Sequence, residues 1–371
     1  MKNFDPVWDY DYLKKAVSYV LAATLSLFAF ALPKGDAVIL PAGETTTALT
    51  QSEVVTGSHA RDPQTAAFLK KTEVGFVVPG LAEGLIPQGI CYDDAHGVYL
   101  ISGYYEDDTP SQICVVNKDG AFSGSVGVIT PGGKRSTGHF GGIAVFGDWV
   151  YVANTDNFYV LSLPEILETD EPFVPAKASF KTCLPATSGA EVANGVLWFS
   201  QFTENSGKSV KAAEPVYQTK RGHKLYARAD GYVLDADAPF GIRERNLMEG
   251  VAYPDQAIAI PNEVQGMTFT PAGDLVFSCS YGRAMRSFVV VCKDVTVREA
   301  DETLTLHTVP VPLWHCRLLD RKATLTAPPM LQEVCVGNDG RLCFLSESGA
   351  AKYRLDGGLD PFDEVLFVSL P

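Results

Sequence analysis

Apolar and polar positions alternate with a period of two along most of the chain after residue 72, which predicts β-strands. The apolar runs are rich in β-branched and aromatic residues, as in Val150–Val152 and Phe288–Cys292. Short turns rich in Gly, Asn and Asp separate the runs, for example 193–195 and 337–340. The pattern predicts an all-β domain built from hairpins.

One hairpin pattern returns five times, each copy opening with a small or amide residue before an apolar strand, a turn and a second strand. The copies align on Gln88, Gly141, Ala190, Gln265 and Gln332. Units that recur at roughly 50–75 residues cannot bury their own apolar face and must stack on their neighbours. We therefore expect a β-propeller with five blades, and a sixth, degenerate blade within 205–262 is the alternative.

Glycine follows the aligned residue in several units. The position holds Gly89, Gly142 and Gly266, with Glu191 and Glu333 in the other two units. Glycine is disfavoured inside strands unless another backbone comes close. The recurrence predicts that the first strands of the units approach one another around a central axis.

The N-terminus carries a targeting pattern. Lys14 and Lys15 precede an uncharged, mostly apolar stretch over 16–33, and Ala29-Phe30-Ala31 offers a small-x-small cleavage site. We expect residues 1–33 to form an apolar helix that acts as a signal peptide, with an uncleaved membrane anchor through 16–33 as the alternative. Residues 34–71 read as a flexible linker and 72–371 as the propeller domain, secreted or held outside the cytoplasm.

The formal net charge of the 371-residue chain is −14. A nucleic-acid backbone or an anionic membrane surface requires clustered Lys and Arg, so neither is an expected partner. Eight cysteines are present, but no Cys-x-x-Cys spacing occurs, and five of them lie in apolar strand runs. We expect buried thiols rather than a zinc site.

The repeat style resembles a known class. The motifs are Gln-Gly-Ile or Gln-Gly-Met in first strands and Val-Tyr-Val-Ala-Asn at 150–154 in a second strand. In this repeat style, about residues 73–369 resemble bacterial extracytoplasmic propellers of the YVTN and gluconolactonase-like kind. The resemblance implies a divalent cation such as Ca²⁺ in the channel and hydrolysis of a lactone or glycosidic bond. The implied ligands are Glu191, Glu333 and Asn154, with His139 as a proton shuttle, although no Asp occupies a leading position as it does in that family.

Leading residues of first strands should cluster near one mouth of the channel. The polar candidates there are Gln88, His139, Glu191, Gln265 and Glu333. The ends of second strands add polar groups at Ser102, Asn154, Gln201, Ser280 and Glu347. Asn154 is a further ligand-binding candidate, and so are Tyr104 and Tyr281, whose aromatic rings suit a sugar. Glu191 and Glu333 are the candidate acid–base pair if they stand about 5–9.5 Å apart. The alternative is that these groups only satisfy one another.

Two functions remain open. The first is an exported propeller that binds a small polar ligand, a carbohydrate, a peptide or an envelope protein at the channel mouth or loops without chemistry. The second is a metal-dependent, lactonase-like or glycosidic hydrolase that uses the channel. No Gly-x-Ser-x-Gly or His-Glu-x-x-His motif occurs in the sequence. The only cofactor that the resemblance implies is a divalent cation such as Ca²⁺.

Overall fold

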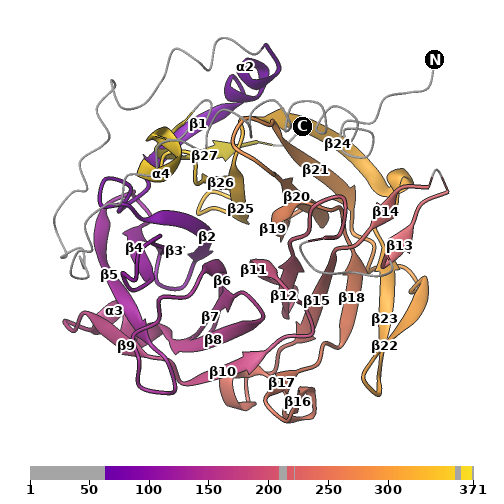
Figure 1. The fold of residues 1–371 in the computed structure, drawn as a ribbon, viewed down its shortest axis with the longest axis horizontal. Coiled ribbons are helices and arrows are strands. Elements are labelled where there is room, and N and C mark those ends of the chain that lie inside the picture. Colours follow the sequence, from indigo (N-terminus) through magenta and orange to yellow (C-terminus); the bar gives the residue numbers. More distant parts are fainter. Residues whose placement is uncertain (1–62, 209–214, 221, 356–360, 370–371) are drawn as a thin grey trace.

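The computed structural model describes residues 63–208, 215–220, 222–355 and 361–369. Five β-sheets stand around a central axis as the blades of a propeller (Figure 1). The predicted all-β, five-bladed architecture is confirmed. The predicted N-terminal apolar helix and most of the linker lie outside the described residues.

Each blade has four antiparallel strands, and in blades 1 to 4 they follow chain order from the axis outward. Blade 1 contains β2 (Ile86–Asp93), β3 (Val98–Tyr104), β4 (Gln112–Asn117) and β5 (Phe122–Ile129). Blade 2 contains β6 (Phe140–Phe146), β7 (Trp149–Asn154), β8 (Asn157–Ser162) and β10 (Ala178–Lys181). Blade 3 contains β11 (Thr187–Ala193), β12 (Val196–Gln201), β15 (Arg228–Val233) and β18 (Gln256–Ala259). Blade 4 contains β19 (Val264–Phe269), β20 (Asp274–Cys279), β21 (Ser287–Lys293) and β24 (Arg321–Ala327).

Blade 5 closes the ring with strands from both ends of the described chain. It contains β25 (Leu331–Val336), β26 (Leu342–Ser346), β27 (Glu364–Val368) and, outermost, β1 (Thr72–Val77). The innermost strand β25 also contacts β2 of blade 1. Because β1 pairs with β27, the ring is held shut by backbone hydrogen bonds between chain ends.

Short additional elements decorate the blades. They are β9 (Phe173–Pro175) on blade 1, β17 (Val251–Ala252) and β16 (Leu247–Met248) on blade 2, β23 (Val309–His315) and β22 (Glu302–Leu306) on blade 3, and the separate hairpin of β13 (Tyr217–Gln218) and β14 (Lys224–Leu225). The short helices are α2 (Pro63–Leu69), α3 (Leu163–Glu168) and α4 (Ala351–Leu355). The interval 205–262 supplies decorations and two strands of blade 3, so its described residues form no sixth blade.

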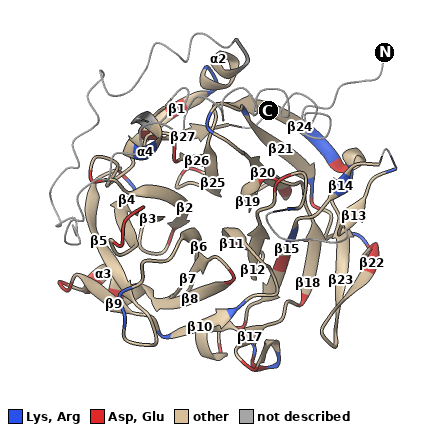
Figure 2. Cartoon of the chain, viewed as in Figure 1, with Lys and Arg blue, Asp and Glu red and all other residues tan. Residues whose placement is uncertain are grey.

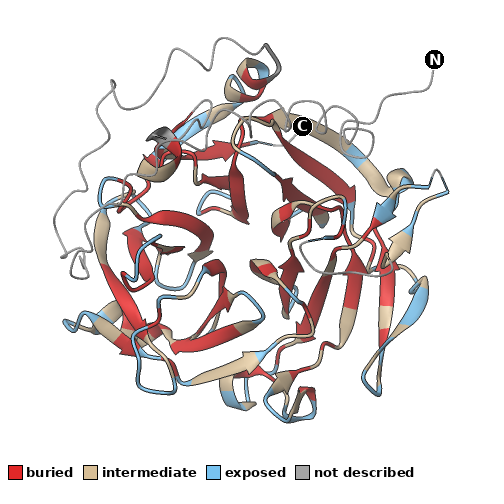
Figure 3. Ribbon diagram, viewed as in Figure 1, coloured by how far each residue is buried: buried red, intermediate tan, exposed pale blue. Residues whose placement is uncertain are grey.

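The core lies between neighbouring blades, where buried strands face each other, while exposed residues concentrate in the turns and outer edges (Figure 3). Trp198, Tyr151 and Tyr232 are among the largest fully buried side chains. Full burial of one such apolar side chain contributes roughly 1.5–3 kcal/mol. Seven of the eight cysteines are buried, including the five that lie in the predicted strand runs.

Charged residues of both signs are scattered around the ring, with no basic stripe along one blade (Figure 2). The scatter of charge is a property of the described residues, and the expectation that nucleic acid is not a partner stays a prediction. Within the same residues, no helix has the length and apolar character needed to cross a bilayer.

A β-bulge recurs near the start of every innermost strand, where two residues oppose one on the second strand. The bulged pairs are Gln88–Gly89 opposite Ser102, Gly141–Gly142 opposite Ala153, Ser188–Gly189 opposite Ser200, Gln265–Gly266 opposite Ser278 and Gln332–Glu333 opposite Leu345. A bulge turns the strand and redirects its side chains. The bulges correct the alignment of the third unit, where Ser188 rather than Ala190 matches Gln88.

Candidate functional site

The second residue of each bulge stands at the axis, and in four blades it is glycine. A Cβ on Gly89 would lie 2.6 Å from the Gly141 carbonyl oxygen, and one on Gly189 would lie 2.9 Å from the Gly266 Cα. A Cβ on Gly142 would overlap the backbone of Gly189 and Ala190. These glycines have no left-handed φ, so close approach of backbones, rather than conformation, requires them.

Glu333 occupies the fifth position of this ring, and its side chain fills the space that the glycines leave. The side chain is fully buried. Its Oε2 accepts a hydrogen bond from the Ala190 N–H at 3.0 Å, and its Oε1 accepts one from the Met267 N–H at 3.1 Å. Since Ala190 and Met267 belong to blades 3 and 4, one carboxyl group from blade 5 ties three blades together across the axis.

Burial raises the pKa of Glu333 well above its ordinary value, and the nearby Glu191 carboxyl raises it further. The three backbone N–H donors act in the opposite direction but do not reverse the shift. Both oxygens are engaged by backbone, so this carboxyl group serves the fold and is closed to a ligand. The ring of backbones and Glu333 fills the channel at this level.

Glu191 lies two residues beyond the ring on β11, on the side where the innermost strands end. Its Oε1 accepts a hydrogen bond from the Thr268 hydroxyl at 3.0 Å, and the side chain is partly exposed. Desolvation raises the pKa of Glu191 to about 8. Glu191 and Glu333 are electrostatic neighbours but stand at different levels, and of the two only Glu191 keeps some exposed surface.

The opposite mouth, where the innermost strands begin, is here called the leading face. Around Gln88 at this face lies a second carboxyl cluster centred on Glu347. The Gln88 amide Nε2 donates to Glu347 Oε2 at 2.8 Å, and the Gln332 amide and the Tyr353 hydroxyl also hydrogen-bond the carboxyl group. Desolvation raises the pKa of Glu347 to about 7 despite these bonds and the positive charge of Lys352.

Aromatic side chains extend this cluster to the rim. The Tyr104 ring lies 4.0 Å from the imidazole of His139, which is exposed, and the Tyr104 hydroxyl hydrogen-bonds Tyr353 on α4. The Arg283 guanidinium lies 5.2 Å above the Tyr353 ring. The cluster thus offers a carboxyl group, two amides and two tyrosine rings, with an exposed imidazole at its edge.

The other sequence-predicted residues lie on the same face but outside this cluster. Gln265 donates to the Ser280 carbonyl at 3.3 Å, and Asn154 donates to Asn157 at 2.9 Å. Tyr281 is exposed beside Phe202, with ring centroids 5.8 Å apart. The structure therefore brings Gln88, Tyr104 and His139 together and places Glu191 beyond the axial ring.

Two members of the cluster, Gln332 and Tyr353, were not among the predicted site residues, and Glu347 was expected only as one of several polar residues at the ends of second strands. Glu347 directly follows the second strand of the fifth unit, and Tyr104 ends the second strand of the first unit. This equivalent position in the repeat was the signal in the sequence that placed Glu347 near Tyr104. Tyr353 belongs to a short helix after the repeat, where no periodic pattern marks it.

A metal site receives no support from the geometry. The described residues contain no group of three or more His, Cys, Asp or Glu side chains placed to hold a cation. Calcium is bound by several oxygen ligands together, and the predicted set of Glu191, Glu333 and Asn154 includes a carboxyl group already held by backbone. The cation therefore stays a prediction from resemblance.

Two cavities of about 500 and 460 Å³ open on the face opposite the leading face, at hairpin turns. The larger lies between blades 4 and 5, and its cations are paired: Lys322 with Asp274, and Arg341 with Asp339. The smaller is lined by His96, which pairs with Asp93 behind it, and by Asp94, Lys118 and Asp119. The cations of the larger cavity are already paired, whereas the Glu347 cluster gathers polar side chains from β2, β25 and α4, so the leading face is the stronger candidate.

We expect the free energy of unfolding to fall as the pH rises from 5 to 8, by up to roughly 6 kcal/mol if both pKa shifts act in full. An unfolded glutamate titrates near 4.5, whereas folding raises the pKa of Glu347 to about 7 and that of Glu191 to about 8. Between these values the folded protein binds more protons than the unfolded chain, so raising the pH favours unfolding. Urea unfolding at pH 5, 6.5 and 8 measures the slope, and Glu191→Gln should flatten it. A wild-type stability that increases across this range would contradict the assignment.

The sequence matches no protein-family model and no curated protein sequence. Among solved structures, it is similar to a protein described as an oxidoreductase (glucose dehydrogenase) from Thermus thermophilus, at 14% identity, 80% coverage of this chain, 100% of that chain and a TM-score of 0.39. It is also similar to the PQQ-bound aldose sugar dehydrogenase from Streptomyces coelicolor, at 10% identity, 80% and 96% coverage and a TM-score of 0.41. These values assign no activity, and the chain's own strand pairing defines it as a five-bladed β-propeller.

Proposed function

We propose that this propeller binds a neutral, hydroxyl-rich ligand, a carbohydrate, at the leading face without transforming it. The observation that carries the proposal is the Glu347 carboxyl group, which lies between the amides of Gln88 and Gln332 and the hydroxyl of Tyr353. Carboxyl and amide groups hydrogen-bond sugar hydroxyls, and the Tyr104 ring offers a face for stacking. The net charge of −14 disfavours an anionic ligand, so a neutral glycan fits better than an acidic one.

A glycan array on the purified protein, followed by calorimetry with each hit, tests this proposal. We expect Glu347→Ala to weaken Kd by about 10- to 100-fold, the range for loss of a hydrogen bond to a charged or strongly polar group. Glu168→Ala removes an exposed carboxyl group at the end of α3 and should leave Kd unchanged. An array with no hit, or equal affinity of Glu347→Ala and wild type, would remove carbohydrate and leave a peptide or envelope protein as the ligand to be tested by pull-down.

Hydrolysis at the same mouth is the second candidate, and the titration of Glu347 favours it. A carboxyl group whose pKa is raised to about 7 can donate or accept a proton at neutral pH, as a general acid or base requires. The likeness to gluconolactonase-like propellers suggests lactone substrates, assayed with and without added Ca²⁺. Turnover that disappears in Glu347→Gln while binding persists would establish catalysis; absence of turnover with all lactones and aryl glycosides would exclude these substrates.

Export through residues 1–33 belongs to the same proposal. The lysines before an apolar stretch and the Ala29-Phe30-Ala31 site support it. Mass spectrometry of the mature protein distinguishes the two forms: an N-terminus near Leu32 indicates cleavage, and an intact Met1 in the membrane fraction indicates an anchor. Unprocessed protein in the cytoplasm would contradict both.

A further inference from the structure

The segment between β21 and β24 leaves its own blade and returns to it. After β21 of blade 4, the chain forms β22 and β23, and β23 pairs in parallel with β18 of blade 3. The chain then returns to blade 4, where β24 pairs with β21. We call residues 294–315 the arm. The arm is an inter-blade connection, because its strands extend blade 3 while the strands before and after it, β21 and β24, belong to blade 4.

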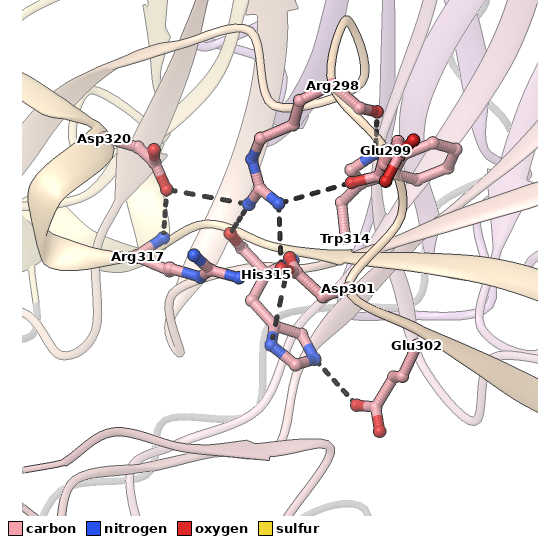
Figure 4. A network of polar contacts seen from close by, with 8 residues as sticks. All are labelled: Arg298, Glu299, Asp301, Glu302, Trp314, His315, Arg317 and Asp320. Carbon is pink, nitrogen blue, oxygen red and sulfur yellow. Dashed lines mark hydrogen bonds and ion pairs between the residues drawn. The ribbon is translucent and has the colours of Figure 1, made fainter.

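Polar contacts hold the arm together (Figure 4). The Arg298 guanidinium pairs with Asp301 at 2.8 Å and donates to the His315 carbonyl at 3.0 Å. The Trp314 indole N–H donates to the Arg298 carbonyl at 2.8 Å. The His315 Nε2 lies within hydrogen-bond distance of Glu302 Oε1, at 2.7 Å. The His315 ring stacks on that of Tyr217 in the β13–β14 hairpin, with ring centroids 4.1 Å apart. The part of the arm next to its base, where 298–302 meet 314–315, is therefore a single packed unit.

Two cysteines stand at the base of the arm. Cys292 is the penultimate residue of β21, and Cys316 follows directly after β23. Both are almost completely buried, with 1% and 2% of their surface exposed. Their Sγ atoms are 3.1 Å apart, about 1 Å more than the roughly 2.05 Å of a disulfide bond. This separation needs only a small rotation of the two side chains to form a bond.

We propose that Cys292 and Cys316 form a disulfide that closes the base of the arm and locks blade 3 to blade 4. The oxidant is an external disulfide, such as the oxidised form of a low-molecular-weight thiol or the active-site disulfide of a dithiol oxidase. One cysteine thiolate attacks it and releases one external thiol; the second cysteine thiolate then attacks the mixed disulfide and releases the other. The protein loses two protons and two electrons, which the external disulfide receives as it becomes two thiols.

The burial of both sulfur atoms sets when the exchange takes place. Exchange requires access to the sulfur, so it occurs during folding, before the arm packs. Once buried, the bond is shielded from reductant. Cys335 and Cys343, which are directly opposite each other on β25 and β26, provide an internal comparison, because their link would join two strands already joined by one short turn.

The test uses the full chain refolded in a buffer of oxidised and reduced glutathione, alkylated under denaturing conditions and mapped by mass spectrometry. We expect a cross-linked peptide pair containing Cys292 and Cys316, and a protein two hydrogen atoms lighter than the fully reduced form. Alkylation of both cysteines after oxidising refolding, or a Cys335–Cys343 link in their place, would overturn the proposal. This result does not depend on where the protein resides in the cell.

A second measurement separates a lock on the arm from an incidental bond. Limited proteolysis of oxidised wild type should cut within 294–315 about tenfold more slowly than the reduced protein, since a closed base restrains local opening. The double variant Cys292→Ala, Cys316→Ala should lose this dependence on reductant, whereas Cys183→Ala, which removes a half-buried thiol elsewhere, should keep it. Equal cleavage of oxidised and reduced wild type would refute the lock even if the bond forms.

Discussion

Replacing Gly142 by alanine is expected to destabilise the propeller by more than about 3 kcal/mol, at or above the upper end of the usual range for overpacking. The added Cβ would overlap the backbone of Gly189 and Ala190 in the neighbouring blade and would stand 2.5 Å from Glu333 Oε2. Backbone atoms cannot rotate away as a side chain can. Relief therefore requires blades 2 and 3 to move apart, and that movement would disturb the hydrogen bond from Ala190 to Glu333.

Gly132→Ala is the matched control. Gly132 lies in an exposed turn, has no left-handed φ, and a Cβ there would meet only the Thr130 hydroxyl at 3.7 Å, an ordinary contact. We expect this variant to unfold within about 0.5 kcal/mol of wild type in urea, as surface substitutions usually do. Equal stability of Gly142→Ala and Gly132→Ala would mean that the innermost strands are not packed as the structure places them.

The blade count and the axial glycines could be predicted from the sequence because both are periodic. Each blade needs one buried hairpin and a tight first strand, and Gly89, Gly142 and Gly266 repeat the same requirement, which the structure confirms. The alignment of the third unit was wrong by two residues. Ser188-Gly189-Ala190-Glu191 contains no glutamine to mark the bulge, and glycine and glutamate are both found at the equivalent position in other units.

The candidate site was less accessible to sequence reasoning because its contacts are not periodic. The repeat was enough to place Glu333 at the axis. Its carboxyl group also crosses the axis to two other blades, and this contact depends on the space left by glycines far away in the chain. Tyr353 reaches Glu347 from a helix outside the repeat. Contacts of this kind arise from the closure of the ring, and no local pattern encodes them.

Replacing Glu333 by alanine is expected to cost about 3–5 kcal/mol, because two effects act together. The backbone N–H groups of Ala190 and Met267 lose their acceptor in a site closed to solvent, and the missing side chain leaves a cavity at the meeting point of the blades. Each buried, unsatisfied donor alone costs about 1–3 kcal/mol.

Glu333→Gln separates shape from hydrogen bonding. The amide fills the same volume and keeps one acceptor oxygen, but its NH₂ group faces an N–H donor. We therefore expect a free energy of unfolding between those of wild type and Glu333→Ala. Urea unfolding of the three proteins at pH 5, where the raised pKa keeps the Glu333 carboxyl group protonated, gives the order. If Glu333→Ala is as stable as wild type, strand packing alone holds the axis together, and the buried carboxyl group does not stabilise the fold.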